Sequence, residues 1–168
     1  MFSATKTNYK KMLFQWGLAS GMIFILLVAL ALGTNLGILS VVGASSLTSS
    51  TVTVFVSPGV VAKSKHILLG YLLCTIAGLI CFYSADALSQ NYYESFVGGY
   101  QIIFAVLAVA ITLLLMAIFH VIHPPAVGFA VGLVLDRWNI PILSIFIGYA
   151  VLLCVVRFLL RNRLVNLA

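Results

Sequence analysis

Two histidines and a double proline interrupt a long apolar run near position 120, in the segment FHVIHPPAVGFAVG. Imidazole both donates and accepts hydrogen bonds, and it exchanges protons near neutral pH. Proline is costly inside a helix but suits the first position of one. We therefore expect one helix to end by His123 and a new helix to open at Pro124 and Pro125, where free amides and the positive dipole end attract anions.

His120 and His123 stand three residues apart, so they share a face for as long as the helix lasts. Two interpretations stay open. The histidines either cap the helix end at the membrane interface, or act on a permeation path as hydrogen-bond donors or titrating gates. A metal site is disfavoured because no carboxylate or thiolate stands near the pair in the sequence.

A second polar stretch, GASSLTSSTVT, covers residues 43–53, and seven of its eleven residues carry hydroxyl groups. Hydroxyls in a membrane helix can bond to carbonyls of the same helix, so helix packing is one interpretation. In the other, Gly43 frees the backbone, and Ser45, Ser46 and Ser49 line a polar path. Uncharged donors suit a weakly hydrated anion, whereas a cation path needs carboxylates, which the apolar segments almost lack.

The composition defines the environment of both motifs. Of the 168 residues, 63% are hydrophobic and 7% are charged, a balance that no water-soluble domain of this size accommodates. The chain is predicted to form a single integral membrane domain. Nucleic-acid binding and enzymatic activity are not predicted, since there is no basic stripe, no phosphate-binding loop and no carboxylate placed to orient a Ser–His pair. No cofactor is expected.

Six apolar segments can be separated, at about residues 12–33, 38–61, 66–88, 100–120, 126–136 and 140–160. Four of them have the length of a full transmembrane helix. The second is rich in Ser and Thr, and the fifth, with 11 residues, spans only about 17 Å as a helix. The predicted fold class is an all-α membrane protein with four full transmembrane helices plus two shorter interrupted segments.

The two unusual segments take equivalent places in two similar stretches of the chain. ILLGYLL at residues 67–73 resembles IFIGYAV at residues 145–151, which lies 78 positions later, and the same offset places Ser46 over Pro124. The order of a long span, an interrupted segment and a long span then occurs twice. We predict internal halves at 12–88 and 99–163, inverted relative to each other if every segment crosses the membrane.

Charged residues predict the orientation. Lys and Arg gather before the first segment and after the last, which places both termini in the cytoplasm by the positive-inside tendency. If all six segments cross, Lys63 and Lys65 also lie inside, and the loop with Asp86 and Glu94 lies outside. If the second and fifth segments only dip into the membrane, Lys63 and Lys65 lie outside. Charge therefore favours six crossings, whereas the short fifth segment favours a dip.

These motifs carry a family resemblance over about residues 20–160. HPPAVGFAV resembles the signature of the HPP family of small integral membrane proteins, and GASSLTSSTVTVFVSP followed by HILLGYLL resembles an earlier block of that family. The resemblance implies four membrane-spanning helices and a transport role, with nitrite transport associated with cyanobacterial and plastid members. The residues to which it points are His123, Pro124, Pro125, Gly43, Ala44, Ser45, the Ser57–Pro58 turn and Gly70.

The sequence thus predicts a transporter or channel for a small monovalent anion, nitrite first and nitrate second, in the lipid bilayer of a bacterial inner membrane. The predicted path residues are His120, His123, Pro124, Pro125, Gly43, Ala44, Ser45, Ser46 and Ser49. A homo-oligomer is expected because so small a chain encloses little space. Two alternatives stay open: a non-conducting membrane sensor or partner subunit, and a metal or cation transporter that uses His66, His120 and His123.

Overall fold

The computed structural model describes residues 6–33, 37–57, 59–91, 97–136 and 138–164. These residues form six helices and no strand, so the predicted all-α class is confirmed. The helices are α1 (Lys6–Gly33), α2 (Ile38–Val56), α3 (Ser64–Asn91), α4 (Val97–Ile118), α5 (Pro125–Leu135) and α6 (Ile140–Leu160). Pro58 of the predicted turn and residues 92–96 of the acidic loop lie outside the described ranges.

Five of these helices are long and apolar enough to cross a membrane, and α5 is the exception. Its 11 residues span about 16 Å, so the prediction of a short fifth segment is confirmed. The prediction of an interruption in the second segment is wrong, because α2 runs without a break for 19 residues through Gly43 and Ser46. The hydroxyls of Ser50 and Thr51 bond to carbonyls one turn earlier, so this Ser- and Thr-rich helix satisfies much of its own polarity.

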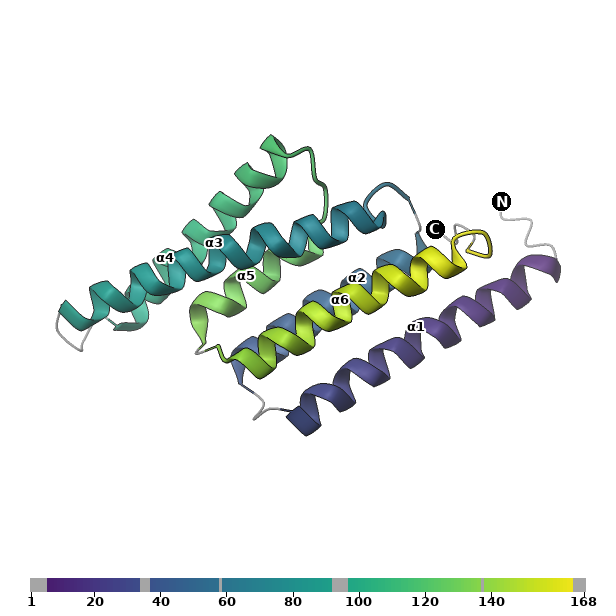
Figure 1. Ribbon diagram of the computed structural model, residues 1–168, viewed down its shortest axis with the longest axis horizontal. Coiled ribbons are helices and arrows are strands. Elements are labelled where there is room, and N and C mark those ends of the chain that lie inside the picture. The colour runs from purple at the N-terminus through teal and green to yellow at the C-terminus, as the bar shows by residue number, and fades with distance from the viewer. Residues whose placement is uncertain (1–5, 34–36, 58, 92–96, 137, 165–168) are drawn as a thin grey trace.

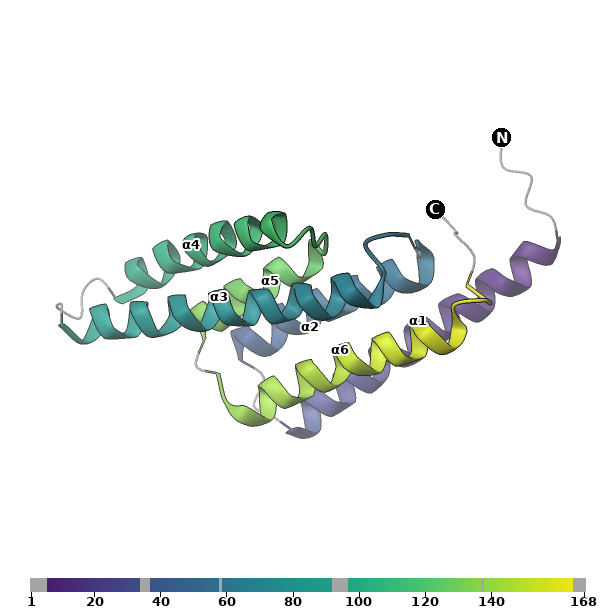
Figure 2. The same cartoon turned by 45° about the horizontal axis from the view of Figure 1, so that its top comes forward.

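The helices run back and forth along one long axis, and both termini lie at the same end of the bundle (Figure 1). Helices α2 and α5 pack against each other; α1 and α6 pack on α2, while α3 and α4 pack on α5. Figure 2 shows α1 and α6 together on one side of the bundle and α3 and α4 together on the other. Contacts between α3 and α6 link the two groups.

This packing has the pattern that two similar halves require. If α1, α2 and α3 correspond to α4, α5 and α6, then each pair of helices with extensive contacts corresponds to another such pair or to itself. The α1–α2 pair becomes α4–α5, and the α2–α6 pair becomes α3–α5, while α2–α5 is unchanged. The duplication with halves at 12–88 and 99–163 stays a prediction.

Three helix ends are fixed by local chemistry. At the end of α4, the Val121 amide donates to the Met116 carbonyl at 2.8 Å and His120 has a φ of 51°, which together form a Schellman motif. The α6 helix starts after Asn139, whose side chain accepts from the Ile142 amide at 2.9 Å. At the start of α2, the Asp136 carboxylate accepts from the Leu39 amide at 2.9 Å.

Charged side chains separate between the two ends of the bundle. The end that holds the termini also holds the α2–α3 connection, and the described cations near this end are Lys10, Lys11, Lys63, Lys65, Arg157, Arg161 and Arg163. Lys10 and Lys11 line one hollow together with Arg163, so the start of α1 lies beside the end of α6. The described carboxylates, Asp86 and Asp136, lie near the opposite end, late in α3 and directly after α5.

Candidate functional site

Four polar side chains meet inside the bundle where the α4–α5 connection reaches α2 and α3. Ser46 and Ser50 come from α2, Tyr71 from α3, and His123 from the connection. Ser50 and His123 are fully buried, and Ser46 and Tyr71 are each 5% exposed. We call this group the hydroxyl–histidine cluster. Buried polar groups require hydrogen-bond partners, and this cluster supplies them mainly from its own members.

The hydrogen bonds of the cluster join elements that are distant in the sequence. The Tyr71 hydroxyl lies 3.0 Å from Ser46 Oγ and 2.8 Å from Ser50 Oγ. Ser50 Oγ lies 2.9 Å from His123 Nε2. The Ser46 hydroxyl also donates to the Pro125 carbonyl. The cluster therefore ties α2 to α3 and to the first turn of α5.

His123 is held on three sides. Its Nδ1 lies 3.2 Å from the Val61 carbonyl in the α2–α3 connection, and its ring packs on that of Tyr71 with centroids 5.6 Å apart. The third contact is with Gly70 of α3, where an added Cβ would lie 2.8 Å from His123 Cβ. Any larger residue at position 70 would push the imidazole out of place, which gives a physical reason for the glycine.

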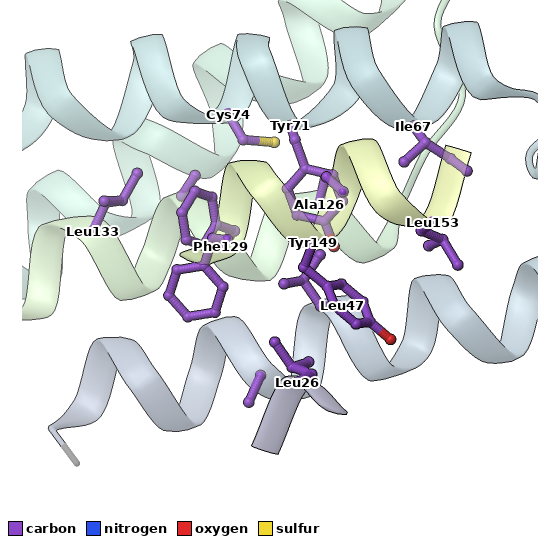
Figure 3. Packing of buried hydrophobic residues seen from close by; sticks show 14 of the residues in the cluster. Leu26, Leu47, Ile67, Tyr71, Cys74, Ala126, Phe129, Leu133, Tyr149 and Leu153 are labelled. Atoms are coloured by element: carbon purple, nitrogen blue, oxygen red, sulfur yellow. The ribbon is translucent and has the colours of Figure 1, made fainter. Parts of the chain in front are cut away.

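A second tyrosine reaches α2 from the other side. Tyr149 of α6 places its hydroxyl 2.8 Å from Thr51 Oγ1, and Thr51 in turn donates to the Leu47 carbonyl at 2.8 Å. Tyr71 and Tyr149 belong to the same buried core, next to Leu47 and Ala126 (Figure 3). Hydroxyl groups of α2 thus meet one tyrosine from α3 and one from α6.

The structure separates the two histidines of the HPP motif. His120 is exposed and occupies the left-handed position that closes α4, two residues after the helix ends at Ile118. His123 is buried in the cluster. The two histidines therefore share no helical face, because α4 ends at Ile118, before either of them. His66, the third histidine, accepts from the Ile122 amide at 2.9 Å and so holds the connection in place.

The expected anion site at free amides of the α5 start is not supported. Pro124 and Pro125 have no amide hydrogen. The next two amides already donate within the turn, Ala126 to the His123 carbonyl at 3.1 Å and Val127 to the Pro124 carbonyl at 3.0 Å. The prolines shape the turn that places His123, and the donors at this site are side chains.

The predicted path residues on α2 divide between two faces. Ser46 is buried in the cluster, whereas Ser45 and Ser49 are exposed on the other side of the helix and do not join it. Ala44 is buried in the apolar core. Gly43 is helical, and an added Cβ there would overlap the Phe146 ring, so its small size permits α2 and α6 to approach.

Sequence reasoning missed Ser50, Thr51, Tyr71 and Tyr149. One signal was present: the similar stretches ILLGYLL and IFIGYAV place a Gly-Tyr pair at matching positions in the two halves. A second was the spacing of Ser46 and Ser50, which lie on one face of a helix at four residues apart. Neither signal shows which face of α2 is buried, and that choice depends on tertiary packing.

An apolar cavity of about 260 Å³ borders the cluster between α3 and α6. Its lining includes the Tyr71 ring together with Leu68, Leu72, Phe129, Phe146 and Ile147. Tyr149 does not line it. The Tyr71 ring therefore has free volume beside it.

Within the described ranges, no three His, Cys, Asp or Glu side chains gather in a way that could hold a metal ion. No curated protein and no solved structure matches this chain. The sequence pattern of the family described as "HPP, transmembrane region" matches residues 4–167, nearly the whole chain. With five long apolar helices and a histidine-proline-proline turn that builds its buried polar cluster, this multi-pass integral membrane protein belongs to the HPP transmembrane family.

Proposed function

We propose that this protein carries a small monovalent anion across the membrane, with nitrite as the first candidate and nitrate as the second. The observation that carries the proposal is the buried hydroxyl–histidine cluster of Ser46, Ser50, Tyr71 and His123. A membrane-buried polar cluster is costly to maintain, so it is more typical of a substrate path than of a packing core.

The chemistry of the cluster favours an anion over a cation. Hydroxyl and imidazole N–H groups donate hydrogen bonds without fixing a full charge, which suits a weakly hydrated anion that must also leave again. A cation would need acceptor oxygens with negative charge. The described carboxylates, Asp86 and Asp136, lie near the opposite end of the bundle.

The short length of α5 places the hydroxyl–histidine cluster at its start inside the hydrocarbon layer of the membrane. At about 16 Å it covers roughly half of a hydrocarbon layer of about 30 Å, so at least one of its ends lies inside that layer. Non-helical backbone at such depth is tolerated where it is buried in protein or lines a polar cavity. The α4–α5 connection meets this condition through His123, Pro125 and their hydroxyl partners.

Tyr71 is the proposed gate. Its hydroxyl joins two serines of α2, while its ring borders the cavity of about 260 Å³ between α3 and α6. A ring beside free volume can rotate without displacing close-packed neighbours. Rotation of the Tyr71 ring would open the cluster to an anion. When the anion leaves, the ring would rotate back and its hydroxyl would bond again to Ser46 and Ser50.

The same proposal includes the orientation and the assembly. Since the described cations gather at the end that holds both termini, we place this end in the cytoplasm of a bacterial inner membrane. We also propose a homo-oligomer with one cluster per subunit. Helices α1 and α4 offer the surface for this contact, because only 22% of the apolar span of each is buried within the chain.

Anion flux into liposomes that contain the purified protein tests the proposal. Nitrite, nitrate, formate and chloride are compared above neutral pH, where leak of nitrous acid is small. The test variant is Ser46→Ala, which removes a buried donor, and the matched control is Ser45→Ala, the exposed neighbouring serine. We expect protein-dependent nitrite flux that falls at least about tenfold in Ser46→Ala and stays within about twofold in Ser45→Ala, because loss of the buried hydroxyl that joins Tyr71 to Pro125 costs about 1–3 kcal/mol.

Two results would redirect the assignment. Absence of flux for every anion would overturn the transport proposal and favour a partner subunit, to be tested by looking for a protein that co-purifies with the native chain and not with the His123→Ala variant. Metal retained on the purified protein and lost when His66 and His123 are both changed to Ala would favour a metal transporter.

A further inference from the structure

The hydroxyl–histidine cluster contains fewer protons than its contacts require. A serine or tyrosine hydroxyl has one proton to donate, and a carbonyl oxygen only accepts. The Ser46 proton is committed to the Pro125 carbonyl. The Ser50 hydroxyl has two acceptors within reach, the Ser46 carbonyl at 3.1 Å and His123 Nε2 at 2.9 Å.

The contact of His123 with Val61 fixes which ring nitrogen carries the proton. The Val61 carbonyl, 3.2 Å from Nδ1, can only accept, so Nδ1 is the protonated nitrogen. The neutral ring therefore directs the lone pair of Nε2 at Ser50. His123 is fully buried and the described carboxylates lie near the other end of the bundle, so the ring is neutral when no anion is present.

The three hydroxyl protons of the cluster therefore cannot serve all five of its contacts while Nε2 of His123 carries none. Three acceptors, namely the Pro125 carbonyl, the Ser46 carbonyl and His123 Nε2, compete for the two protons of Ser46 and Ser50. The Tyr71 proton is spent on one of the two serine oxygens. A single added proton at Nε2 reduces this deficit, because the ring then donates to Ser50 Oγ and the Ser50 proton passes to the Ser46 carbonyl.

The same deficit prevents the neutral cluster from binding an anion. An anion needs donors, and every hydroxyl proton in the cluster already has an acceptor. We infer that the anion binds together with one proton, which is taken up at Nε2 of His123. The imidazolium balances the negative charge, and the Tyr71 hydroxyl is released to donate to the anion. This inference rests on the proposed anion-transport function.

The transfer balances without any redox step. The proton comes from water on the entry side and forms an N–H bond at Nε2, while the hydrogen bond from the Ser50 hydroxyl to Nε2 is broken. On the exit side the N–H bond returns its proton to water and the anion leaves. The protein then moves one anion and one proton in the same direction, with no net charge.

Among the residues that the structure describes, no other group near His123 offers an equivalent proton site. Helix α2 presents only the hydroxyls of Ser46 and Ser50, and α3 presents Tyr71 and His66. His66 uses the lone pair of Nδ1 to accept from the Ile122 amide at 2.9 Å, which fixes its role in the connection. Lys63 and Lys65 are exposed, and Tyr149 of α6 contacts Thr51.

Isothermal calorimetry of the purified full chain tests the inference. Sodium nitrate and sodium nitrite are titrated slightly above neutral pH in HEPES and in Tris, two buffers that differ in their heat of protonation. Both anions are fully ionised there, so a proton taken up on binding is held by the protein. We expect uptake of about one proton per anion and a Kd that rises about tenfold per pH unit, as linkage requires when the free site is neutral and the bound site is protonated.

The matched variant is His123→Gln, in which an amide supplies a neutral donor to Ser50 and cannot titrate. We expect it to bind the anion with no proton uptake and with a Kd that does not change with pH. The change of Kd with pH in the native protein tests the proton uptake even if this variant does not fold. Anion binding without proton uptake in the native protein would overturn the inference and leave the proposed function standing. Absence of both binding and flux would overturn both.

Discussion

Tyr71 and Tyr149 occupy matching positions in the two similar stretches, and the structure uses them differently. Both follow a glycine, and both place a hydroxyl 2.8 Å from a hydroxyl of α2. Only Tyr71 also meets a histidine ring and borders a cavity. The Gly-Tyr pair on α6 therefore makes a packing contact with Thr51, whereas the Gly-Tyr pair on α3 belongs to the candidate site.

The difference arises from what each outer helix faces. Tyr71 meets the HPP turn, where His123 packs directly on Gly70. An added Cβ at Gly148, the matching glycine of α6, would meet no atom within 4 Å. A repeated motif can therefore have a different role in each half, depending on the residues that pack against it. Tyr71 packs against His123, which the helix break between α4 and α5 places beside it.

The largest effect is expected from alanine substitution of the two matching glycines. In Gly70→Ala the new methyl group would clash with His123 Cβ, at 2.8 Å, and force the imidazole away from Ser50. We expect anion flux to be lost and unfolding stability in detergent to fall by about 1–3 kcal/mol, the usual cost of overpacking. Gly148→Ala is the control, with unchanged flux and a stability gain of up to about 1 kcal/mol from helix propensity. Equal losses in both variants would contradict the difference between the two halves.

The next test removes the hydroxyl of each tyrosine in turn. Tyr71→Phe deletes the donor that we assign to the anion, so flux should fall at least about tenfold, since hydrogen bonds to charged groups are worth about 1.5–3 kcal/mol. Tyr149→Phe breaks only the contact with Thr51 and should leave flux within about twofold. Both variants should lose about 0.5–1.5 kcal/mol of unfolding stability. Thermal unfolding and liposome flux measure the two effects separately, and a larger flux loss in Tyr149→Phe would reverse the assignment.

A smaller effect is expected from neighbouring serines on opposite faces of α2. Ser50→Ala removes the partner of His123 Nε2 and should reduce flux several-fold while lowering unfolding stability by about 1–3 kcal/mol, the cost of buried groups left unpaired. Ser49 is exposed, so Ser49→Ala should change stability by less than about 0.5 kcal/mol. Flux and thermal unfolding of the pair check both values. Equal changes of flux and stability in the two variants would mean that the buried face of α2 is not the functional one.

Much of the fold could be predicted from the sequence, because hydrophobic segment length determines which stretches span a membrane. The sixth segment was predicted at 140–160, and α6 is Ile140–Leu160. The short fifth segment and the helix break at the HPP motif are also confirmed. The interruption of the second segment was wrong because hydroxyls of Ser50 and Thr51 bond within their own helix, a choice that composition does not reveal.

The candidate site was predicted less well, for a geometric reason. The structure brings His123 and Ser46 into one polar cluster, whereas Ser45 and Ser49, which the sequence analysis grouped with Ser46, are exposed. Rotation by one residue on a helix turns a side chain by about 100°, so membership of the cluster depends on which neighbours cover α2. The partners from α3 and α6 come from tertiary packing, which periodicity in a uniformly apolar chain does not encode.

The smallest effect is expected at Gly128, which matches Ser50 at the offset of the two similar stretches. The second half thus has no hydroxyl at this position, and an added Cβ would lie an ordinary 4.0 Å from Ser46 Cβ. We expect Gly128→Ala to raise unfolding stability by up to about 1 kcal/mol through helix propensity and to leave flux unchanged. Thermal unfolding and liposome flux measure both values. A clear loss of flux with intact stability would instead mean that the anion passes between α2 and α5, beside Ser46, and that both halves rather than the Tyr71 side alone form the path.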